Sequence, residues 1–144
     1  MSPQASPAHR PFRLLIADDD EAFRETVCEV CRPFLEVIEA ASGDEALCVT
    51  HREQLDLALC DLHMPGHTGL DVLSEFRRAQ QRPGILMSAR VSPVERREAE
   101  RLSVYRVLEK PFTRKQLLAT VAEALESVFP QAGLLSQFRH RGVC

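Results

Sequence analysis

The chain has 144 residues, of which 44% are apolar and 27% are charged, and its formal net charge is −3. A chain of this length can form one domain with a core that needs no disulfide or metal cross-links. The near-neutral charge gives no electrostatic reason to expect nucleic acid or an anionic membrane as a partner, and no apolar stretch approaches the length of a membrane span.

In chain order, a flexible tail is expected over residues 1–11, which hold three prolines and no apolar run and are therefore not expected to be a signal peptide. Apolar runs then alternate with segments of helical spacing five times. Ser42, Ser92 and Thr113 are each followed three positions later by Glu or Gln, which predicts helix starts with capping boxes. The expected strands cover 12–17, 35–40, 55–61, 85–87 and 104–109, and the expected helices cover about 23–34, 42–50, 70–76, 92–102 and 113–128.

This alternation predicts an α/β fold. The strands are apolar runs without strict alternation, as is typical of parallel strands covered on both faces. Right-handed crossovers then give a doubly wound parallel sheet with helices on both faces. The domain is expected over 12–128, with 129–144 as a C-terminal tail or the start of a linker. The helix over 92–102 is almost entirely charged and is expected to be the least firmly held.

Polar side chains stand at the ends of four predicted strands. Asp18 and Asp19 follow the first strand, Asp61 ends the third, Ser88 follows the fourth and Lys110 follows the fifth. In a parallel α/β sheet, ligands bind in the crevice at the carboxyl ends of the strands. These groups are therefore expected to meet at one edge of the sheet.

The side chains at this edge suit phosphoryl transfer. Asp18, Asp19 and Asp61 would repel one another unless a cation lay between them, and carboxylate oxygens favour a hard ion such as Mg²⁺. Asp61 offers a nucleophile, while Lys110 and Ser88 offer contacts to phosphoryl oxygens. Taken singly, each residue has a plainer explanation, such as acidic residues at a helix N-terminus or an ordinary strand end. Their combination favours the functional interpretation.

Four segments resemble the receiver domain of the bacterial two-component response regulators. They are residues 14–20 with the acidic pair, residues 61–65 with Gly69 following, residues 86–89 and residues 108–112. The resemblance runs from about residue 12 to 128. It implies a flavodoxin-like strand order 2-1-3-4-5 and a cytoplasmic signalling protein that catalyses only its own phosphorylation and dephosphorylation. The five cysteines, an odd count, also indicate reduced thiols in the cytoplasm.

The resemblance also implies roles for the residues at the strand ends. Asp61 would receive a phosphoryl group from a sensor histidine kinase or a phosphotransfer protein. Mg²⁺ (or Mn²⁺) would be held by Asp19, Asp61 and the backbone carbonyl of His63, with Asp18 acting through water. Lys110 would contact a phosphoryl oxygen, and Ser88 would be the switch hydroxyl. His63 and Arg90 would flank the path of attacking water and so tune the lifetime of the phosphorylated form.

One position departs from the family pattern. Val107 stands three residues before Lys110, where the family usually has a tyrosine or phenylalanine that swings inward. Tyr105 lies two residues earlier and is expected on the same side if the strand is regular. The signal is therefore expected to pass through the loop after Ser88 and the charged helix. The expected output face comprises the fourth helix, fifth strand and fifth helix, read by a partner protein or by a second copy of the chain.

Other candidate sites are weaker. Cys28 and Cys31 form a Cys-x-x-Cys inside a helix without a second pair for zinc, and Cys31 is expected in the core. His63 and His67 lie in a loop, and residues 139–141 are expected to be a solvated basic tail.

Three classes of function remain open. They are a stand-alone receiver, a receiver from a longer regulator with a DNA-binding or enzymatic output, and a small phosphohydrolase or phosphotransferase acting through Asp61. Against the third class, position 63 holds histidine and not a second aspartate. No nucleic-acid binding is expected of this chain itself, because too few residues follow 128 for a helix-turn-helix.

Overall fold

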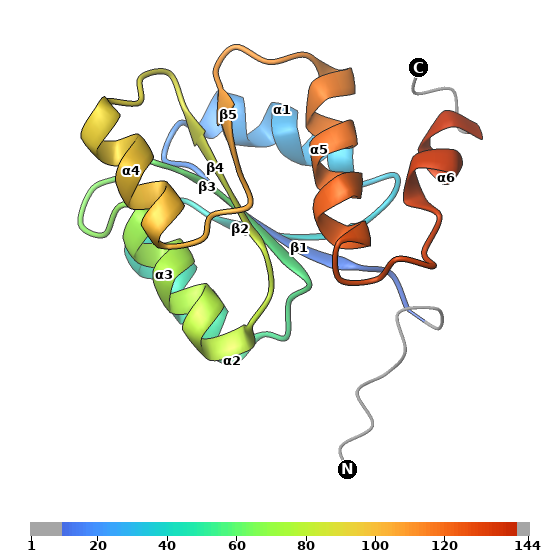
Figure 1. Ribbon diagram of the computed structural model, residues 1–144, viewed down its shortest axis with the longest axis horizontal. Coiled ribbons are helices and arrows are strands. Elements are labelled where there is room, and N and C mark those ends of the chain that lie inside the picture. The colour runs from blue at the N-terminus through green and yellow to red at the C-terminus, as the bar shows by residue number, and fades with distance from the viewer. Residues whose placement is uncertain (1–9, 141–144) are drawn as a thin grey trace.

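A computed structural model describes residues 10–140 and has five parallel strands in one sheet, in the order β2-β1-β3-β4-β5, with helices on both faces (Figure 1). The predicted doubly wound architecture and strand order are confirmed. The strands are β1 (Arg13–Ala17), β2 (Glu36–Ala40), β3 (Leu57–Asp61), β4 (Gly84–Ser88) and β5 (Arg106–Glu109). The helices are α1 (Glu21–Cys31), α2 (Gly43–Arg52), α3 (Gly69–Gln80), α4 (Pro93–Arg101), α5 (Arg114–Glu126) and α6 (Leu134–His140).

The core is divided by the sheet into two apolar clusters. Leu14 and Ile16 of β1 belong to the cluster beneath α1 and α5, whereas Leu15 and Ala17 belong to the cluster beneath α2 and α3. Successive side chains of a strand point to opposite faces, and all four of these are fully buried. Both faces of the sheet therefore need apolar residues, which is why the strand sequences do not alternate.

Side-chain caps fix where the helices begin. Ser92 and Thr113 accept from the third backbone N–H of their helices, and both form the predicted reciprocal capping boxes. Ser42 also caps its helix, but Glu45 accepts from the backbone N–H of Ala41 instead of that of Ser42. The predicted box at Ser42 is therefore replaced by a contact one residue earlier.

Helix α4 has little contact with the core, as predicted. Ala99 is its one buried residue, and Val94 is 65% exposed. Ion pairs join Arg96 to Glu109 and Arg101 to Glu98. Such exposed pairs stabilise by less than about 1 kcal/mol each, so α4 is weakly anchored.

The segment expected to be a C-terminal tail or linker instead contains α6, which packs against α5 (Figure 1). Leu134 and Phe138 lie one helical turn apart and are each 3% exposed, and the Phe138 ring lies 4.4 Å from that of Phe34. The Glu126 carboxylate accepts from the backbone N–H of Leu134. The prediction is wrong here because the apolar pattern of a seven-residue helix is too short to give a clear helical signal in the sequence. The remaining parts of the expected tails, 1–9 and 141–144, lie outside the described residues.

Strand β5 is shorter than predicted, and this changes the position of Tyr105. Tyr105 packs against the cluster beneath α1 and α5, whereas Val107 packs against the opposite cluster. The expectation that both face the same side is wrong, because β5 begins at Arg106 and strand alternation does not extend to residue 105. No helix in the described part of the chain is long and apolar enough to cross a membrane.

Candidate functional site

The predicted acidic and basic side chains meet at the carboxyl edge of the sheet. One carboxylate oxygen each from Asp18, Asp19 and Asp61 lies within 4.8 Å of the others. The Lys110 Nζ atom lies 2.9 Å from Asp18 Oδ2 and 3.1 Å from Asp61 Oδ1. Asp18 and Asp61 are buried and Asp19 is exposed. The structure therefore brings four of the predicted residues into one cluster.

Strand register sets this arrangement. Asp61 ends β3 opposite Met87 of β4, and the Lys110 backbone N–H donates to the Ser88 carbonyl across β4 and β5. The start of α3 approaches the end of β3 closely: a Cβ at Gly69 would collide with the Asp61 carbonyl. Glycine is thus required at position 69 for the loop after Asp61 to close.

The cluster carries more negative than positive charge. Burial raises the pKa of Asp61, the Asp18 charge raises it further, and Lys110 opposes both. For Lys110, burial lowers the pKa, but the hydrogen bond and charge of Asp18 together with Asp61 outweigh it, so the net change is upward. The surroundings therefore favour the charged form of Lys110 and disfavour the ionised form of Asp61.

Asp18 is held by neighbours that the sequence analysis did not identify. Its Oδ1 accepts from the Asp20 backbone N–H, and its backbone carbonyl accepts from Arg24 Nη1 at 2.7 Å. Arg24 also donates to Glu39 in β2. An arginine one turn into a helix is usually solvated, so no sequence signal distinguishes Arg24.

The side chains of Ser88 and His63 both contact the backbone of Arg90. The Ser88 hydroxyl donates to the Arg90 carbonyl at 2.5 Å and accepts from the Arg90 N–H at 3.1 Å. His63 Nε2 lies 3.3 Å from the same carbonyl. The two residues expected to tune phosphoryl lifetime are thus neighbours, and the contact between them is made by the backbone carbonyl of Arg90.

Phe23 lies against the same cluster. The Lys110 Nζ atom is 4.0 Å from the centroid of the Phe23 ring, and the edge of that ring meets Phe112 at 5.7 Å and 82°. The sequence pattern placed Phe23 on the apolar face of α1, and hydrophobic periodicity alone does not predict that the ring also contacts a charge.

The weaker candidates have structural roles. Cys28 and Cys31 are fully buried, and burial raises the pKa of their thiols to about 11 and about 12. They are therefore protonated core residues. His67 pairs with Asp44 and not with His63. The side chains of residues 139–141 lie outside the described part of the chain.

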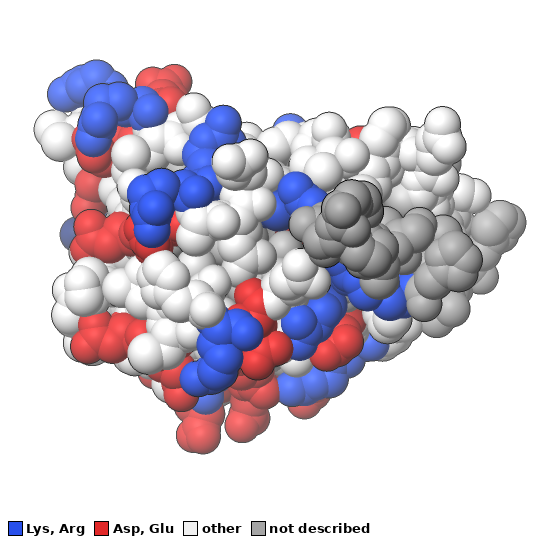
Figure 2. Space-filling view, turned by 90° about the horizontal axis from the view of Figure 1, so that it is seen from below, with Lys and Arg blue, Asp and Glu red and all other residues white. Residues whose placement is uncertain are grey.

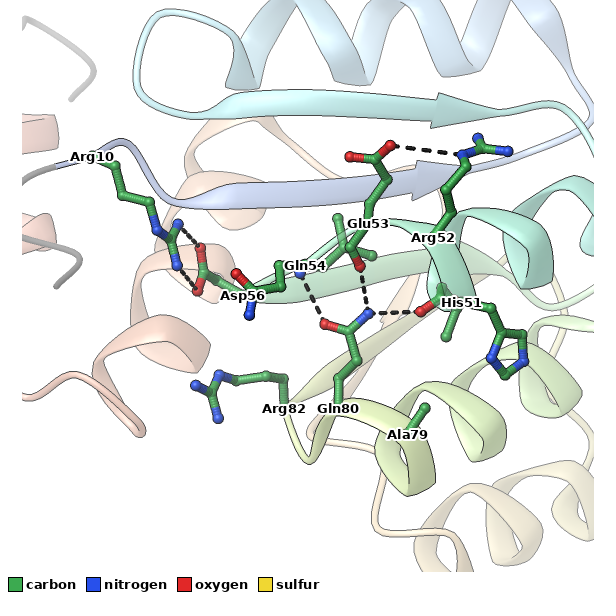
Figure 3. Close-up of a pocket in the computed structure, with 11 residues that line it drawn as sticks. Arg10, His51, Arg52, Glu53, Gln54, Asp56, Ala79, Gln80 and Arg82 are labelled. Carbon is green, nitrogen blue, oxygen red and sulfur yellow. Dashed lines mark hydrogen bonds and ion pairs between the residues drawn. The ribbon is translucent and has the colours of Figure 1, made fainter. Parts of the chain in front are cut away.

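A hollow of about 320 Å³ lies at the opposite edge of the sheet, where the strands begin (Figure 3). Arg10 and Arg52, which line it, are already paired with Asp56 and Glu53. Gln80, also in its wall, bonds to backbone groups around it. Arg10, Arg52 and Gln80 in the wall of this hollow therefore already have partners within the fold.

The family comparison agrees with the fold and with the cluster of side chains at the strand ends. Residues 14–122 match the family model of the response regulator receiver domain, and the chain belongs to this family. Receiver domains act in two-component systems, where they interact with histidine kinases or phosphotransfer proteins and with output domains.

Curated relatives are about one third identical to this chain over the aligned residues. It is 34% identical over 128 residues to the sensory/regulatory protein RpfC of Xanthomonas campestris pv. campestris, covering 79% of this chain and 16% of RpfC. It is 30% identical over 125 residues to the transcriptional regulatory protein GlrR of Escherichia coli, covering 85% of this chain and 28% of GlrR. It is 32% identical to the transcriptional regulatory protein CpxR of Klebsiella pneumoniae, covering 78% and 49%. The chain spans less than half the length of these relatives.

Solved structures of similar proteins match the chain closely. The chemotaxis protein CheY4 of Vibrio cholerae superposes with a TM-score of 0.74 at 27% identity, covering 80% of this chain and 99% of that one. The CheY-like receiver domain protein of Methanospirillum hungatei superposes with a TM-score of 0.79 at 24% identity, covering 82% and 96%. The second likeness concerns the fold alone.

Proposed function

We propose that Asp61 accepts a phosphoryl group from a histidine kinase or phosphotransfer protein, in a reaction that requires Mg²⁺ or Mn²⁺. The observation that carries this proposal is the meeting of three carboxylates with Lys110 at the end of β3. An Asp61 oxygen attacks the phosphorus, the P–N bond to the donor histidine breaks, and the imidazole takes a proton as it leaves. An acyl phosphate then stands on Asp61.

The donor set fits a hard divalent cation. Asp19, Asp61 and the His63 carbonyl would hold it directly, since oxygen ligands and an open position suit Mg²⁺. Both oxygens of Asp18 already have partners, Asp20 N–H and Lys110, which supports an indirect role through water. When bound, the ion would supply positive charge that orients and neutralises the phosphoryl oxygens.

A titration with Mg²⁺ tests the ligand assignment. Asp19→Asn should weaken Mg²⁺ binding more than Asp18→Asn does, because it removes a direct ligand and Asp18 acts through water. Both variants lose one negative charge, so each serves as the charge control for the other. Equal or reversed losses would contradict the assignment of the pair.

The phosphoacceptor role can be tested with acetyl phosphate and Mg²⁺ followed by intact mass spectrometry. The wild-type chain should gain one phosphoryl group, and Asp61→Asn or EDTA should prevent this. Asp44→Asn, which removes an exposed carboxylate outside the cluster, is the matched control and should label normally. Wild-type labelling of Asp61→Asn would overturn the proposal.

Conformational switching would begin at Ser88. Its hydroxyl would leave the Arg90 carbonyl for a phosphoryl oxygen, exchanging one hydrogen bond for another and drawing the loop before α4. Because α4 buries Ala99 alone, little free energy is needed to reposition it. The α4, β5 and α5 surface is then the output face for a protein partner or a second copy of the chain. Val107 supplies no swinging ring at this face.

Hydrogen exchange with and without beryllofluoride tests this switch. Protection should change over residues 88–102 and fade in Ser88→Ala. Changes confined to α1 and α2 would place the output elsewhere. Replacing both His63 and Arg90 by alanine should shift the dephosphorylation rate, because both flank the path of attacking water; an unchanged rate would remove them from this role.

A second candidate is that this chain is the receiver segment of a longer regulator with its own output domain. The observation that favours it is the coverage of RpfC, GlrR and CpxR, of which the chain matches 16%, 28% and 49%. The apparent mass of the native protein in an immunoblot distinguishes the two, since a stand-alone receiver would migrate at 16.2 kDa.

A further inference from the structure

The Lys110 ammonium has three neighbours, and one of them is not an oxygen. Asp18 Oδ2 and Asp61 Oδ1 lie 2.9 Å and 3.1 Å from Nζ. The Phe23 ring lies on another side, with its centroid 4.0 Å from Nζ. A cation over an aromatic face is attracted by the negative face of the ring, so Phe23 supplies an electrostatic contact and not only apolar packing.

The Phe23 ring is itself fixed from two directions. The Phe23 backbone N–H donates to the N-cap Asp20 at 3.1 Å, which sets the first turn of α1. Its ring meets Phe112 edge-on at 5.7 Å and 82°. This is a favoured arrangement for two aromatic rings. The fixed ring therefore limits the positions that the flexible Lys110 side chain can take.

Phosphorylation would change one of the three contacts and leave another untouched. When an Asp61 oxygen becomes part of an acyl phosphate, Asp61 no longer offers Lys110 the same anionic oxygen. The Phe23 ring carries no ionisable group, so its attraction for the ammonium is the same before and after the reaction. It can therefore hold Nζ while the anionic partner changes from carboxylate to phosphoryl oxygen.

We propose that Phe23 is a positioning residue for phosphoryl transfer, holding the Lys110 ammonium beside the position that the phosphoryl oxygens occupy. The role rests on the proposed function of Asp61. A lysine head group on four methylenes can otherwise follow either carboxylate, and the aromatic face restricts it to the side of the cluster where α1 begins.

The first test compares labelling rates of Phe23 variants with acetyl phosphate. Phe23→Leu keeps an apolar side chain but removes the aromatic face. It should lower the maximal rate by up to about fivefold, because Lys110 without the ring lies less often beside the phosphoryl position, and the strength of a partly exposed cation–π contact sets this limit. Phe23→Tyr and Phe23→Trp should restore most of the rate. The Mg²⁺ concentration for half-maximal labelling should stay unchanged, because Phe23 is assigned no contact with the metal ligands.

Phe12→Leu is the matched control for lost aromatic packing. Phe12 stacks on Phe129 at the far edge of the sheet and is 7% exposed. It should lower thermal stability at least as much as Phe23→Leu and leave the labelling rate unchanged. Equal rate losses in the two variants would mean that general destabilisation is the cause, and would overturn the positioning role.

A second test needs neither metal nor phosphodonor. In the NMR spectrum of the resting protein, the ring current of Phe23 should shift the ε-methylene protons of Lys110 upfield, and this shift should vanish in Phe23→Leu. Its persistence in that variant would overturn the inference. Failure of the wild-type chain to label would overturn the proposed function and the positioning role together, whereas equal rates in wild type and Phe23→Leu would overturn the positioning role alone.

Discussion

Buried aspartates lie at both edges of the sheet, but their surroundings differ. Where the strands begin, the Asp56 carboxylate is 2% exposed and accepts from Arg10 at 2.8 and 3.1 Å (Figure 3). It also accepts from the Arg13 backbone N–H at 2.8 Å. Where the strands end, Asp18 and Asp61 share the single ammonium of Lys110. One edge neutralises its buried charge, and the other leaves an excess.

The edge where the strands begin contributes to the stability of the fold, whereas the edge where they end holds the candidate functional site. A bidentate arginine and a backbone N–H give Asp56 the partners that a buried carboxylate needs. The carboxyl edge instead keeps like charges close together, and their repulsion lowers the stability of the folded chain. Figure 2 shows acidic and basic side chains interspersed on the face seen from below.

The largest expected effect is at the neutralised edge. Arg10→Met should lower the free energy of unfolding by about 3 kcal/mol, because it leaves the Asp56 carboxylate buried without its cation. Asp56→Asn should cost less, about 1 kcal/mol, because Arg10 is 26% exposed and its charge can reach water. Urea unfolding measures both.

The asymmetry between these two variants tests the comparison. The double variant Arg10→Met with Asp56→Asn should lose less than the sum of the single losses, since neither buried charge remains. A smaller loss in Arg10→Met than in Asp56→Asn would show that Asp56 does not depend on its arginine.

Gln80 at the same edge should give the next largest effect. Its side chain accepts from the Leu55 N–H and donates to the carbonyls of Thr50 and Glu53, at 2.8 to 2.9 Å. Gln80→Ala should therefore cost about 2 kcal/mol in urea unfolding. Gln54→Ala is the control, because Gln54 is exposed and accepts a hydrogen bond from Arg13 through its backbone carbonyl. If Gln80→Ala lowers the free energy of unfolding no more than Gln54→Ala does, the Gln80 hydrogen bonds do not stabilise this edge.

The carboxyl edge was largely predictable from the sequence, and the other edge was not. Asp18, Asp61 and Lys110 each follow an apolar strand, and parallel strands bring their carboxyl ends together. Asp56 directly precedes β3, and Gln80 is the last residue of α3. Their polar contacts join separate elements, which hydrophobic periodicity does not predict. Helix caps and hydrophobic periodicity were sufficient to predict the fold, because both are encoded in short stretches of the sequence.

The failures of sequence reasoning concern tertiary packing. Helix α6 exists because Leu134 and Phe138 reach apolar surface already formed by Phe34 and α5, and a sequence window does not contain that surface. Tyr105 was assigned by extending strand alternation past the start of β5. The contact of Phe23 with Lys110 joins residues far apart in the sequence, so only the folded chain brings it about.

Removing the excess charge at the carboxyl edge should stabilise the metal-free protein. Asp61→Asn relieves repulsion from Asp18 and Asp19 while leaving Lys110 paired with Asp18, and should raise the free energy of unfolding by about 1 kcal/mol in EDTA. Adding Mg²⁺ should stabilise wild type and leave the variant unchanged. A variant less stable than wild type in EDTA would mean that the Lys110 contact outweighs the repulsion.

The smallest effect is the pH dependence of that same difference. The pKa of Asp61 is raised in the folded protein, first by burial and then by Asp18, so the folded state binds its proton at a higher pH than the unfolded chain does. Stability from this group is therefore full below the unfolded pKa of about 3.9 and is lost as the pH rises through the folded pKa. Lowering the pH through this window in EDTA should shrink the advantage of Asp61→Asn over wild type, because protonation removes the same charge that the substitution removes. Unfolding free energies of the two proteins at a series of pH values test this. An advantage that stays constant down to about pH 4 would mean that the Asp61 charge is not the source of the strain, and that the two edges differ less than their contacts imply.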